Sequence, residues 1–335
     1  MRAGPHDIGP PHDVGAPPDA LPEDRRVLAR GFGHGKVILL GEHAVVYDQP
    51  ALAAGLSMGV WADVTDGTGH LTAPDWRLHG RAGDATPLGQ ALSAILRRLD
   101  VADVDVRIGG ELPARSGLGS SAAIAMAVAR AVAQARGRDP EAALAAATDA
   151  EVIFHGTPSG IDLAAAASGQ IGLFQRGAGW RPVAVPQSMT LCVGLSGLQR
   201  DTHAQVGAVA RLRQRTPQVE SILVALGEVA LGGKRAVEQG DVDELGRLFD
   251  VAHGLLAALR VSSLELDTLV HHARAAGAVG AKLTGAGGGG AVIALAPGHE
   301  RDVLSRWAAA GFTGFIARIG STRQDAGPLE QGASK

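Results

Sequence analysis

Cysteine is almost absent from this 335-residue sequence, and Cys192 has no partner with which to form a disulfide within the chain. No apolar run reaches the roughly 18 residues that a membrane-spanning helix needs, and the N-terminus lacks the basic-then-apolar pattern of a secretion signal. The net charge is −3, so there is no positive excess to attract nucleic acid. From these absences we expect a cytoplasmic protein that has neither nucleic acid nor membrane as a partner.

Lysine is scarce as well, since it occurs four times against 27 arginines. Lys36 and Lys282 are both expected in glycine-rich loops. Because arginine carries the positive charge elsewhere in the chain, a lysine in such a segment indicates a need for a compact ammonium group rather than a planar guanidinium.

The ends of the chain differ in composition from the rest. Residues 1–24 are dense in proline, glycine, aspartate and histidine, so we expect a disordered tail there, and we expect a flexible tail at 322–335. Between the tails the chain is long enough for two domains, each with its own core. A change from longer elements to short strands followed by helices places the expected boundary near residue 188, which gives domains at 25–188 and 189–321.

Hydrophobic periodicity predicts a mixture of strands and helices. Expected strands are 36–40, 56–64, 104–108, 171–175, 182–185, 190–197, two strands around the glycine loop within 277–296, and 313–319. Expected helices are 87–99, 121–136, 140–155, 203–214, 217–239, 241–258, 263–276 and 298–310. Because strands and helices do not alternate steadily, the order favours an α+β fold over a doubly wound parallel sheet.

The stretch PARSGLGSSAAIA at 113–125 predicts an anion site. It formally fits a dinucleotide fingerprint, but the helix that follows leads into another helix, and Asp139 caps that helix instead of ending a strand. A Walker A loop fails too, because Gly35-Lys36 is followed by valine. What remains is a glycine turn at Gly117 and Gly119 that brings the N–H groups of a helix N-terminus close to a ligand.

The serines and nearby acids leave alternatives open. The hydroxyls of Ser120 and Ser121 could cap the helix or coordinate a phosphate-bound Mg²⁺. Glu151 and Asp162 would each ordinarily be solvated surface acids. The tight turn between them, GTPSG at 156–160, favours a chain that folds back and brings both carboxylates toward one point.

Four motifs in order resemble those of the GHMP kinases. They are GHGKVILLGEHAVVYDQPALA at 33–53, PARSGLGSSAAIA at 113–125, GTPSGID at 156–162 and KLTGAGGGGAVIAL at 282–295. The resemblance spans residues 30–320 and implies the two-domain fold of that family. This fold has an N-terminal mixed α/β ATP-binding domain, expected at 25–188, and a C-terminal ferredoxin-like α+β domain, expected at 189–321.

The first motif is most similar to that of the family branch that phosphorylates mevalonate. Lys36 is followed by Gly41-Glu42-His43, whereas His34 replaces the usual proline before Gly35. The implied reaction is the ATP- and Mg²⁺-dependent phosphorylation of the primary hydroxyl of mevalonate to 5-phosphomevalonate. Alternatives are another small-molecule kinase of the family, for phosphomevalonate or a sugar, and a non-catalytic sensor of the same fold. Family members are often dimers, so the resemblance leaves room for a homodimer.

The resemblance also implies roles for individual residues. Asp162 is similar to the base that faces the substrate hydroxyl, Lys36 to the cation that accompanies it, and Ser121 and Glu151 to the Mg²⁺ ligands. The expected ATP-binding residues are Pro113, Ser116, Gly117, Leu118, Gly119, Ser120, Ser121 and Ala122. The expected substrate-binding residues are Glu42, His43, Arg200, Thr202, Gly287 and Gly288.

Overall fold

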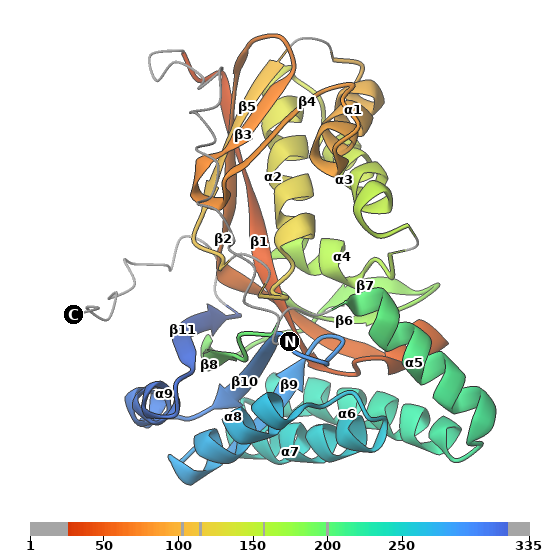
Figure 1. Cartoon of the computed structure of the whole chain (residues 1–335), viewed down its shortest axis with the longest axis vertical. Coiled ribbons are helices and arrows are strands. Elements are labelled where there is room, and N and C mark those ends of the chain that lie inside the picture. The colour runs from red at the N-terminus through yellow and green to blue at the C-terminus, as the bar shows by residue number, and fades with distance from the viewer. Residues whose placement is uncertain (1–25, 102–103, 114–115, 157, 199–200, 321–335) are drawn as a thin grey trace, which may run out of the picture.

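The long strand β2 (Ala51–Asp66) is the spine of the molecule, because it pairs with β1, β5, β6 and β11. The structure is a computed structural model that describes residues 26–101, 104–113, 116–156, 158–198 and 201–320. Within this part of the chain the strands form one 11-stranded sheet. Figure 1 shows an upper half from the first part of the chain and a lower half from the last part, with β1 and β2 running from one into the other.

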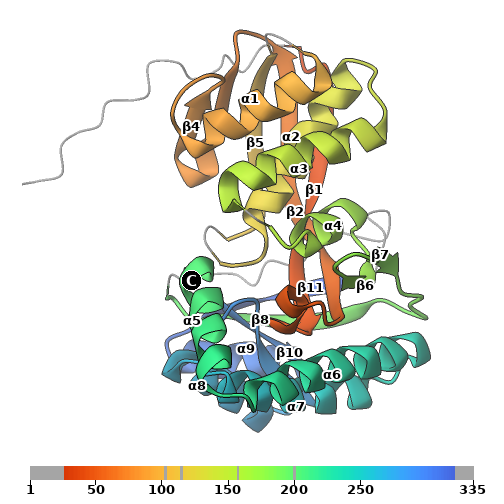
Figure 2. The same cartoon turned by 90° about the vertical axis from the view of Figure 1, so that its right-hand side faces the viewer.

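The upper half joins strands from several parts of the first 182 residues. Its strands are β1 (Ala29–Leu40), β2, β3 (His70–Ala73), β4 (Leu78–Arg81), β5 (Val104–Gly110), β6 (Ile171–Gln175) and β7 (Gly179–Pro182). Its helices are α1 (Pro87–Leu99), α2 (Ser120–Ala135), α3 (Pro140–His155) and α4 (Ile161–Ser168). Figures 1 and 2 show α1, α2 and α3 on one face of the upper strands.

Small residues let α2 pack tightly on β1. A Cβ atom added to Gly33 would lie 2.1 Å from the carbonyl oxygen of Ala123, and one added to Gly31 would lie 2.1 Å from that of Ala127. The helix and the strand therefore meet backbone to backbone, which explains why α2 is rich in buried alanine. This contact fixes the N-terminal end of α2 beside the middle of β1.

The lower half is ferredoxin-like, as the resemblance to the GHMP kinases implied. Its strands are β8 (Met189–Leu195), β9 (Gly280–Thr284), β10 (Ala291–Leu295) and β11 (Thr313–Ile319), in the spatial order β11-β8-β10-β9. Its helices are α5 (Thr202–Arg215), α6 (Val219–Gln239), α7 (Val242–Ala258), α8 (Leu264–Ala275) and α9 (Glu300–Ala309). All three strand pairs are antiparallel, and Figure 1 shows α6, α7, α8 and α9 below the strands.

Most of the predicted elements are present, but several predictions need correction. Strands β3 and β4 were not predicted, and the strand expected at 56–64 extends over 51–66. The strand expected at 36–40 begins at Ala29, because the glycines before it pack against α2 instead of forming a loop. The strand expected at 182–185 is instead β7 at 179–182. The chain turns back directly after β6, and β7 then pairs with β6 residue by residue. Helix α4 was not predicted; it begins after Gly160, whose φ of 90° ends the preceding turn.

The two halves are joined at few points in the sheet. Among the described residues, β11 and β2 pair only at Ile319 and Leu56. Beside this, the hydroxyl of Thr284 accepts a hydrogen bond from the Ile38 N–H and donates one to the Ile38 carbonyl oxygen. Among the described residues, none of the helices has the length and apolar character needed to cross a membrane.

Candidate active site

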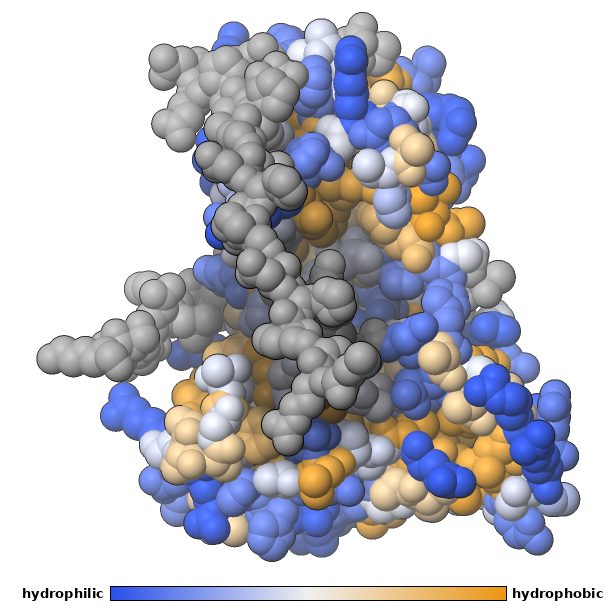
Figure 3. Space-filling model, viewed as in Figure 1, coloured by the Kyte–Doolittle hydropathy of each residue, from blue (hydrophilic) through white to orange (hydrophobic). Residues whose placement is uncertain are grey.

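A cleft of about 1100 Å³ lies between the two halves and is lined by most of the elements that the sequence singled out. Its walls come from β1, the start of α2, the end of α3, the start of α4, the start of α5 and the loop between β9 and β10. The face seen in Figure 3 is hollowed between the upper and lower halves, with apolar side chains along the upper edge of the hollow. The volume is sufficient for a nucleotide together with a small second ligand.

The glycine loop before α2 presents backbone N–H groups to this cleft. Gly117 and Gly119 have φ values of 81° and 77°, a region that glycine enters without cost. Gly119 is the N-cap of α2, and the cap forms no side-chain hydrogen bond. The first N–H groups of the helix are therefore left for another acceptor, which makes the N-terminus of α2 suited to an anion.

Gly119 also makes room for Lys36. A Cβ atom at position 119 would lie 2.5 Å from the Cγ atom of Lys36, so the lysine side chain crosses directly over the glycine. The backbone of Lys36 is held by a hydrogen bond of 2.8 Å from its N–H to the Leu118 carbonyl oxygen. The loop and the lysine are thus positioned by each other.

Lys36 forms an ion pair with Asp162, and both residues line the cleft. The distance from Nζ to Oδ1 is 3.0 Å, and the lysine side chain is 3% exposed whereas that of Asp162 is 34% exposed. Asp162 lies in the first turn of α4, which the Gly160 turn directs into the cleft. A buried cation thus holds a carboxylate whose outer side still faces the cleft.

Ser121 and Glu151 line the same cleft and are joined by a residue that the sequence analysis missed. The hydroxyl Oγ of Ser121 lies 2.8 Å from Nε2 of His155, and the same ring nitrogen lies 4.0 Å from Oε2 of Glu151. His155 follows Glu151 by four positions on α3, so the two side chains share one helix face. That spacing was visible in the sequence and could have identified His155.

The environment of Glu151 fits a cation. Burial raises the pKa of its carboxyl group to about 7, with repulsion from Asp162 as the second cause, while Ser121 and Lys36 oppose the shift. Within the described residues, Oε1 of Glu151 is buried without a hydrogen-bond partner. A buried carboxylate oxygen with no donor is costly, and a hard divalent cation would satisfy it.

No group of three or more histidine, cysteine, aspartate or glutamate side chains in this part of the chain is arranged to hold a metal ion alone. A cation at Ser121 and Glu151 would therefore share its remaining positions with phosphate oxygens and water, as Mg²⁺ commonly does in proteins. The donor set is one hydroxyl and one carboxylate, both of them oxygen ligands.

Glu42 and His43 connect the first motif to the glycine loop at 285–290. The carboxylate of Glu42 is fully buried and paired with the ammonium group of Lys282, and burial raises the pKa of Glu42 while it lowers the pKa of Lys282. Nε2 of His43 lies 2.9 Å from the carbonyl oxygen of Ala286. These contacts bring residues far apart in the sequence together at one end of the cleft.

The remaining predicted residues divide into four groups. Ser120 and Thr202 line the cleft. Leu118 and Ala122 have buried side chains, and the hydroxyl of Ser116 donates to the Pro113 carbonyl oxygen, and none of these four residues lines the cleft. Gly287 and Gly288 pack against Val261 and Gln205, and the loop instead reaches the cleft with Gly285 and Ala286. Arg200 lies outside the described residues.

The cleft also contains side chains that the motifs did not indicate. Trp76 and Leu78 form an apolar part of its wall, and Arg176 and His203 bring basic groups to it. Trp76, Leu78 and Arg176 lie between the motifs, and nothing in their local sequence marks them as part of a site, whereas His203 directly follows the predicted Thr202. Only the tertiary fold shows that they face the same space as Lys36.

Comparisons with known proteins agree with these features. Family models match residues 87–170 as the N-terminal domain of GHMP kinases and residues 234–312 as their C-terminal domain. A mevalonate kinase of Thermococcus gammatolerans is 34% identical, over 88% of this chain and 96% of the relative, and one of Aeropyrum pernix is 36% identical, over 81% and 89%. The crystal structure of L. major mevalonate kinase in complex with R-mevalonate has a TM-score of 0.77 at 28% identity, covering 88% of this chain and 98% of that one.

Proposed function

This chain belongs to the mevalonate kinases of the GHMP kinase family, and on that premise we propose that it transfers the terminal phosphoryl group of ATP to the primary hydroxyl of mevalonate. The products are 5-phosphomevalonate and ADP. The observation that carries the proposal for the site is the Lys36–Asp162 ion pair, which faces the same cleft as the N-terminus of α2.

The roles follow from what phosphoryl transfer requires, namely in-line positioning and balance of negative charge. Asp162 accepts the proton of the attacking hydroxyl, because its carboxylate faces the cleft while Lys36 holds its inner side. The ammonium group of Lys36 also balances charge on the phosphoryl group in transit. The free N–H groups at the start of α2 bind the phosphates of the nucleotide.

The family uses a nucleoside triphosphate with a divalent cation. We propose that this cation is Mg²⁺ and that Ser121 Oγ and the buried carboxylate of Glu151 are its protein ligands. Bound there, it supplies positive charge to the phosphate oxygens. Ser121 then acts as a ligand rather than as a helix cap, which agrees with the absence of a side-chain cap on α2.

The acceptor is tested by measuring ADP release with mevalonate, phosphomevalonate, homoserine and galactose at equal concentrations. We expect turnover with mevalonate and background rates with the other three. Turnover that is fastest with any other acceptor would overturn the substrate assignment and leave the kinase assignment in place.

The base is tested with Asp162→Asn, which keeps the shape of the side chain but cannot accept the proton. We expect turnover to fall to background while ADP still binds, as measured by calorimetry. The matched control is Asp149→Asn, which changes an exposed aspartate that pairs with Arg98 on the surface. Near-native turnover in Asp162→Asn would show that another group accepts the proton.

A further inference from the structure

Strand β9 is the terminal strand of the lower sheet, and it leads directly into the glycine loop at 285–290. Among the described residues it pairs with β10 on one side, and no strand lies on its other side. A terminal strand presents unpaired N–H and C=O groups along its outer edge. In β9 these groups belong to Ala281 and Leu283, which alternate as the period of a strand requires.

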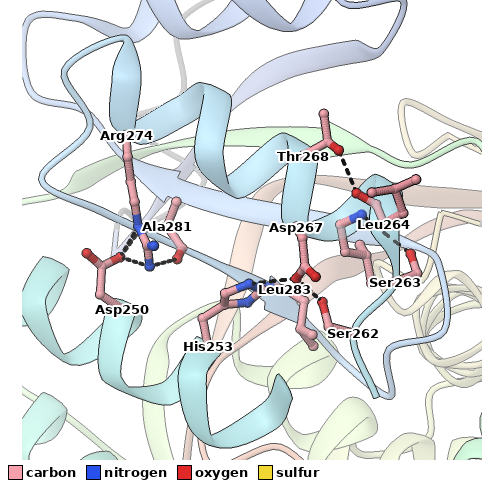
Figure 4. A network of polar contacts seen from close by, with 11 residues as sticks. Asp250, His253, Ser262, Ser263, Leu264, Asp267, Thr268, Arg274, Ala281 and Leu283 are labelled. Carbon is pink, nitrogen blue, oxygen red and sulfur yellow. Dashed lines mark hydrogen bonds and ion pairs between the residues drawn. The ribbon is translucent and has the colours of Figure 1, made fainter. Parts of the chain in front are cut away.

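The outer edge at Ala281 is completed by two charged side chains. The Ala281 N–H donates to Oδ1 of Asp250 at 3.0 Å, and Nη2 of Arg274 donates to the Ala281 carbonyl oxygen at 3.5 Å. Asp250 and Arg274 also pair with each other, with 2.6 Å between Nη2 and Oδ1. Figure 4 shows the carboxylate and the guanidinium side by side against Ala281. Helices α7 and α8 thus supply the acceptor and the donor that a neighbouring strand would provide.

The outer edge at Leu283 is completed in the same way. Its N–H donates to Nδ1 of His253 at 3.4 Å, and its carbonyl oxygen accepts from Nζ of Lys282 at 2.6 Å. Because a backbone N–H can only donate, Nδ1 carries the lone pair, and Nε2–H donates to Oδ1 of Asp267 at 3.1 Å. Burial lowers the pKa of His253, which favours this neutral form, although Asp267 opposes the shift. Ser262 donates a further hydrogen bond to the same carboxylate oxygen (Figure 4).

Two glycines bring α7 close enough for these contacts. A Cβ atom at Gly280 would lie 1.9 Å from the carbonyl oxygen of Gly246, and one at Gly246 would lie 2.7 Å from that of Val279. The helix therefore meets the strand backbone to backbone. Asp250 and His253 follow Gly246 by four and seven positions, which puts all three on one face of α7.

We propose that Asp250 and His253 are positioning residues that take the place of a missing strand beside β9 and thereby set the position of the glycine loop. The loop reaches the cleft through Gly285 and Ala286, and the Ala286 carbonyl oxygen lies 2.9 Å from Nε2 of His43. A shift of β9 would move this carbonyl and disturb His43. That His43 and the loop contact mevalonate rests on the proposed function, whereas the support of β9 by α7 does not.

Amide hydrogen exchange tests the support of β9 directly. In His253→Ala the Leu283 amide loses its acceptor, so we expect it to exchange about tenfold faster, the factor that one lost hydrogen bond typically carries. His253→Asn places an amide oxygen near the position of Nδ1, so we expect it to restore slow exchange. The control is Arg247→Ala, which lies on the same helix and pairs with Glu244 at the surface.

Steady-state kinetics of the same variants test the positioning role. We expect His253→Ala to raise the KM for mevalonate about tenfold, with the dissociation constant of ADP unchanged because the phosphates bind at α2. His253→Asn should return the KM toward the wild-type value. A purely structural role would lower the melting temperature without this separation of mevalonate KM from ADP affinity.

The outcomes separate the two proposals. Unchanged exchange at Leu283 in His253→Ala, or exchange as fast in His253→Asn as in the alanine variant, would overturn the support of β9 by His253. Faster exchange with an unchanged mevalonate KM would overturn the positioning role. If the wild-type protein does not phosphorylate mevalonate, the proposed function fails, and the exchange result still decides whether α7 supports β9.

Discussion

The carboxyl group of Glu151 should destabilise the cation-free protein at alkaline pH. Burial, and secondly repulsion from Asp162, raises its pKa from 4.5 to about 7 in the folded state. The folded protein therefore holds a proton that the unfolded chain releases between these two pH values. The neutral carboxyl group therefore contributes fully to the free energy of unfolding below pH 4.5. This contribution, about 3 kcal/mol, is lost as the pH rises through 7, since one pKa unit corresponds to about 1.4 kcal/mol.

The variant Glu151→Gln isolates this effect, because an amide of the same shape cannot ionise. In buffer with a chelator at pH 8, we expect the variant to be more stable than the wild type by up to about 3 kcal/mol. At pH 4 the wild-type carboxyl is protonated, so the two proteins should unfold at the same urea concentration. The control is Glu228→Gln, which changes an exposed glutamate of α6 and should have the same small effect at both pH values.

The same variant connects stability to cation binding. With Mg²⁺ and ADP present, the melting temperature of the wild type should rise, and the rise should be larger at pH 8 than at pH 6 because protons compete with the cation for the carboxylate. Glu151→Gln should lose most of this Mg²⁺-dependent rise. A variant no more stable than the wild type at pH 8, or a stability difference equal at pH 4 and pH 8, would refute the reasoning.

Three further predictions concern the residues around the proposed phosphate site. Lys36→Met should lower kcat by on the order of a hundredfold or more, through loss of a preorganised charge, and a stopped-assay measurement of ADP checks this. Gly119→Ala should impair turnover, because its Cβ atom would meet the Cγ atom of Lys36 at 2.5 Å and its φ is 77°; native turnover with native ADP affinity would contradict that contact. Ser121→Ala should raise the Mg²⁺ concentration needed for half-maximal rate. An unchanged Mg²⁺ requirement would show that Ser121 is not a ligand of the cation.

Local signals in the sequence were sufficient for most of the fold. The prediction of α3 from Asp139-Pro140 is confirmed, because the aspartate side chain accepts a hydrogen bond from the Ala142 N–H and the proline occupies the first helical position. The glycine turn at 117–119 leads into a helix, as predicted. In contrast, α4 has only eight residues and begins after Gly160 without a side-chain cap, so neither a long periodic pattern nor a start signal marked it as a helix.

Contacts between distant parts of the chain could not be predicted in this way. Lys282 and Glu42 are 240 positions apart, and neither motif indicates that the two side chains pair. The acceptors that complete β9 lie on α7, whose sequence reads simply as an amphipathic helix. Such pairs depend on how two elements pack against each other. Hydrophobic periodicity predicts each element separately and does not predict these contacts. His155 could have been predicted, because it follows Glu151 by four positions on a predicted helix and therefore lies on the same helix face.

The use of lysine at positions 36 and 282 has a geometric explanation. Lys36 crosses Gly119 with its aliphatic chain and reaches Asp162 with a single nitrogen, a path that the wider guanidinium of arginine would not fit. Lys282 has no exposed surface, and its nitrogen serves both Glu42 and the Leu283 carbonyl oxygen from one point. Its burial lowers its pKa, so the pair with Glu42 is what holds the charge in place. Both positions require donors that diverge from one compact centre, which is the property that distinguishes an ammonium group from a guanidinium group.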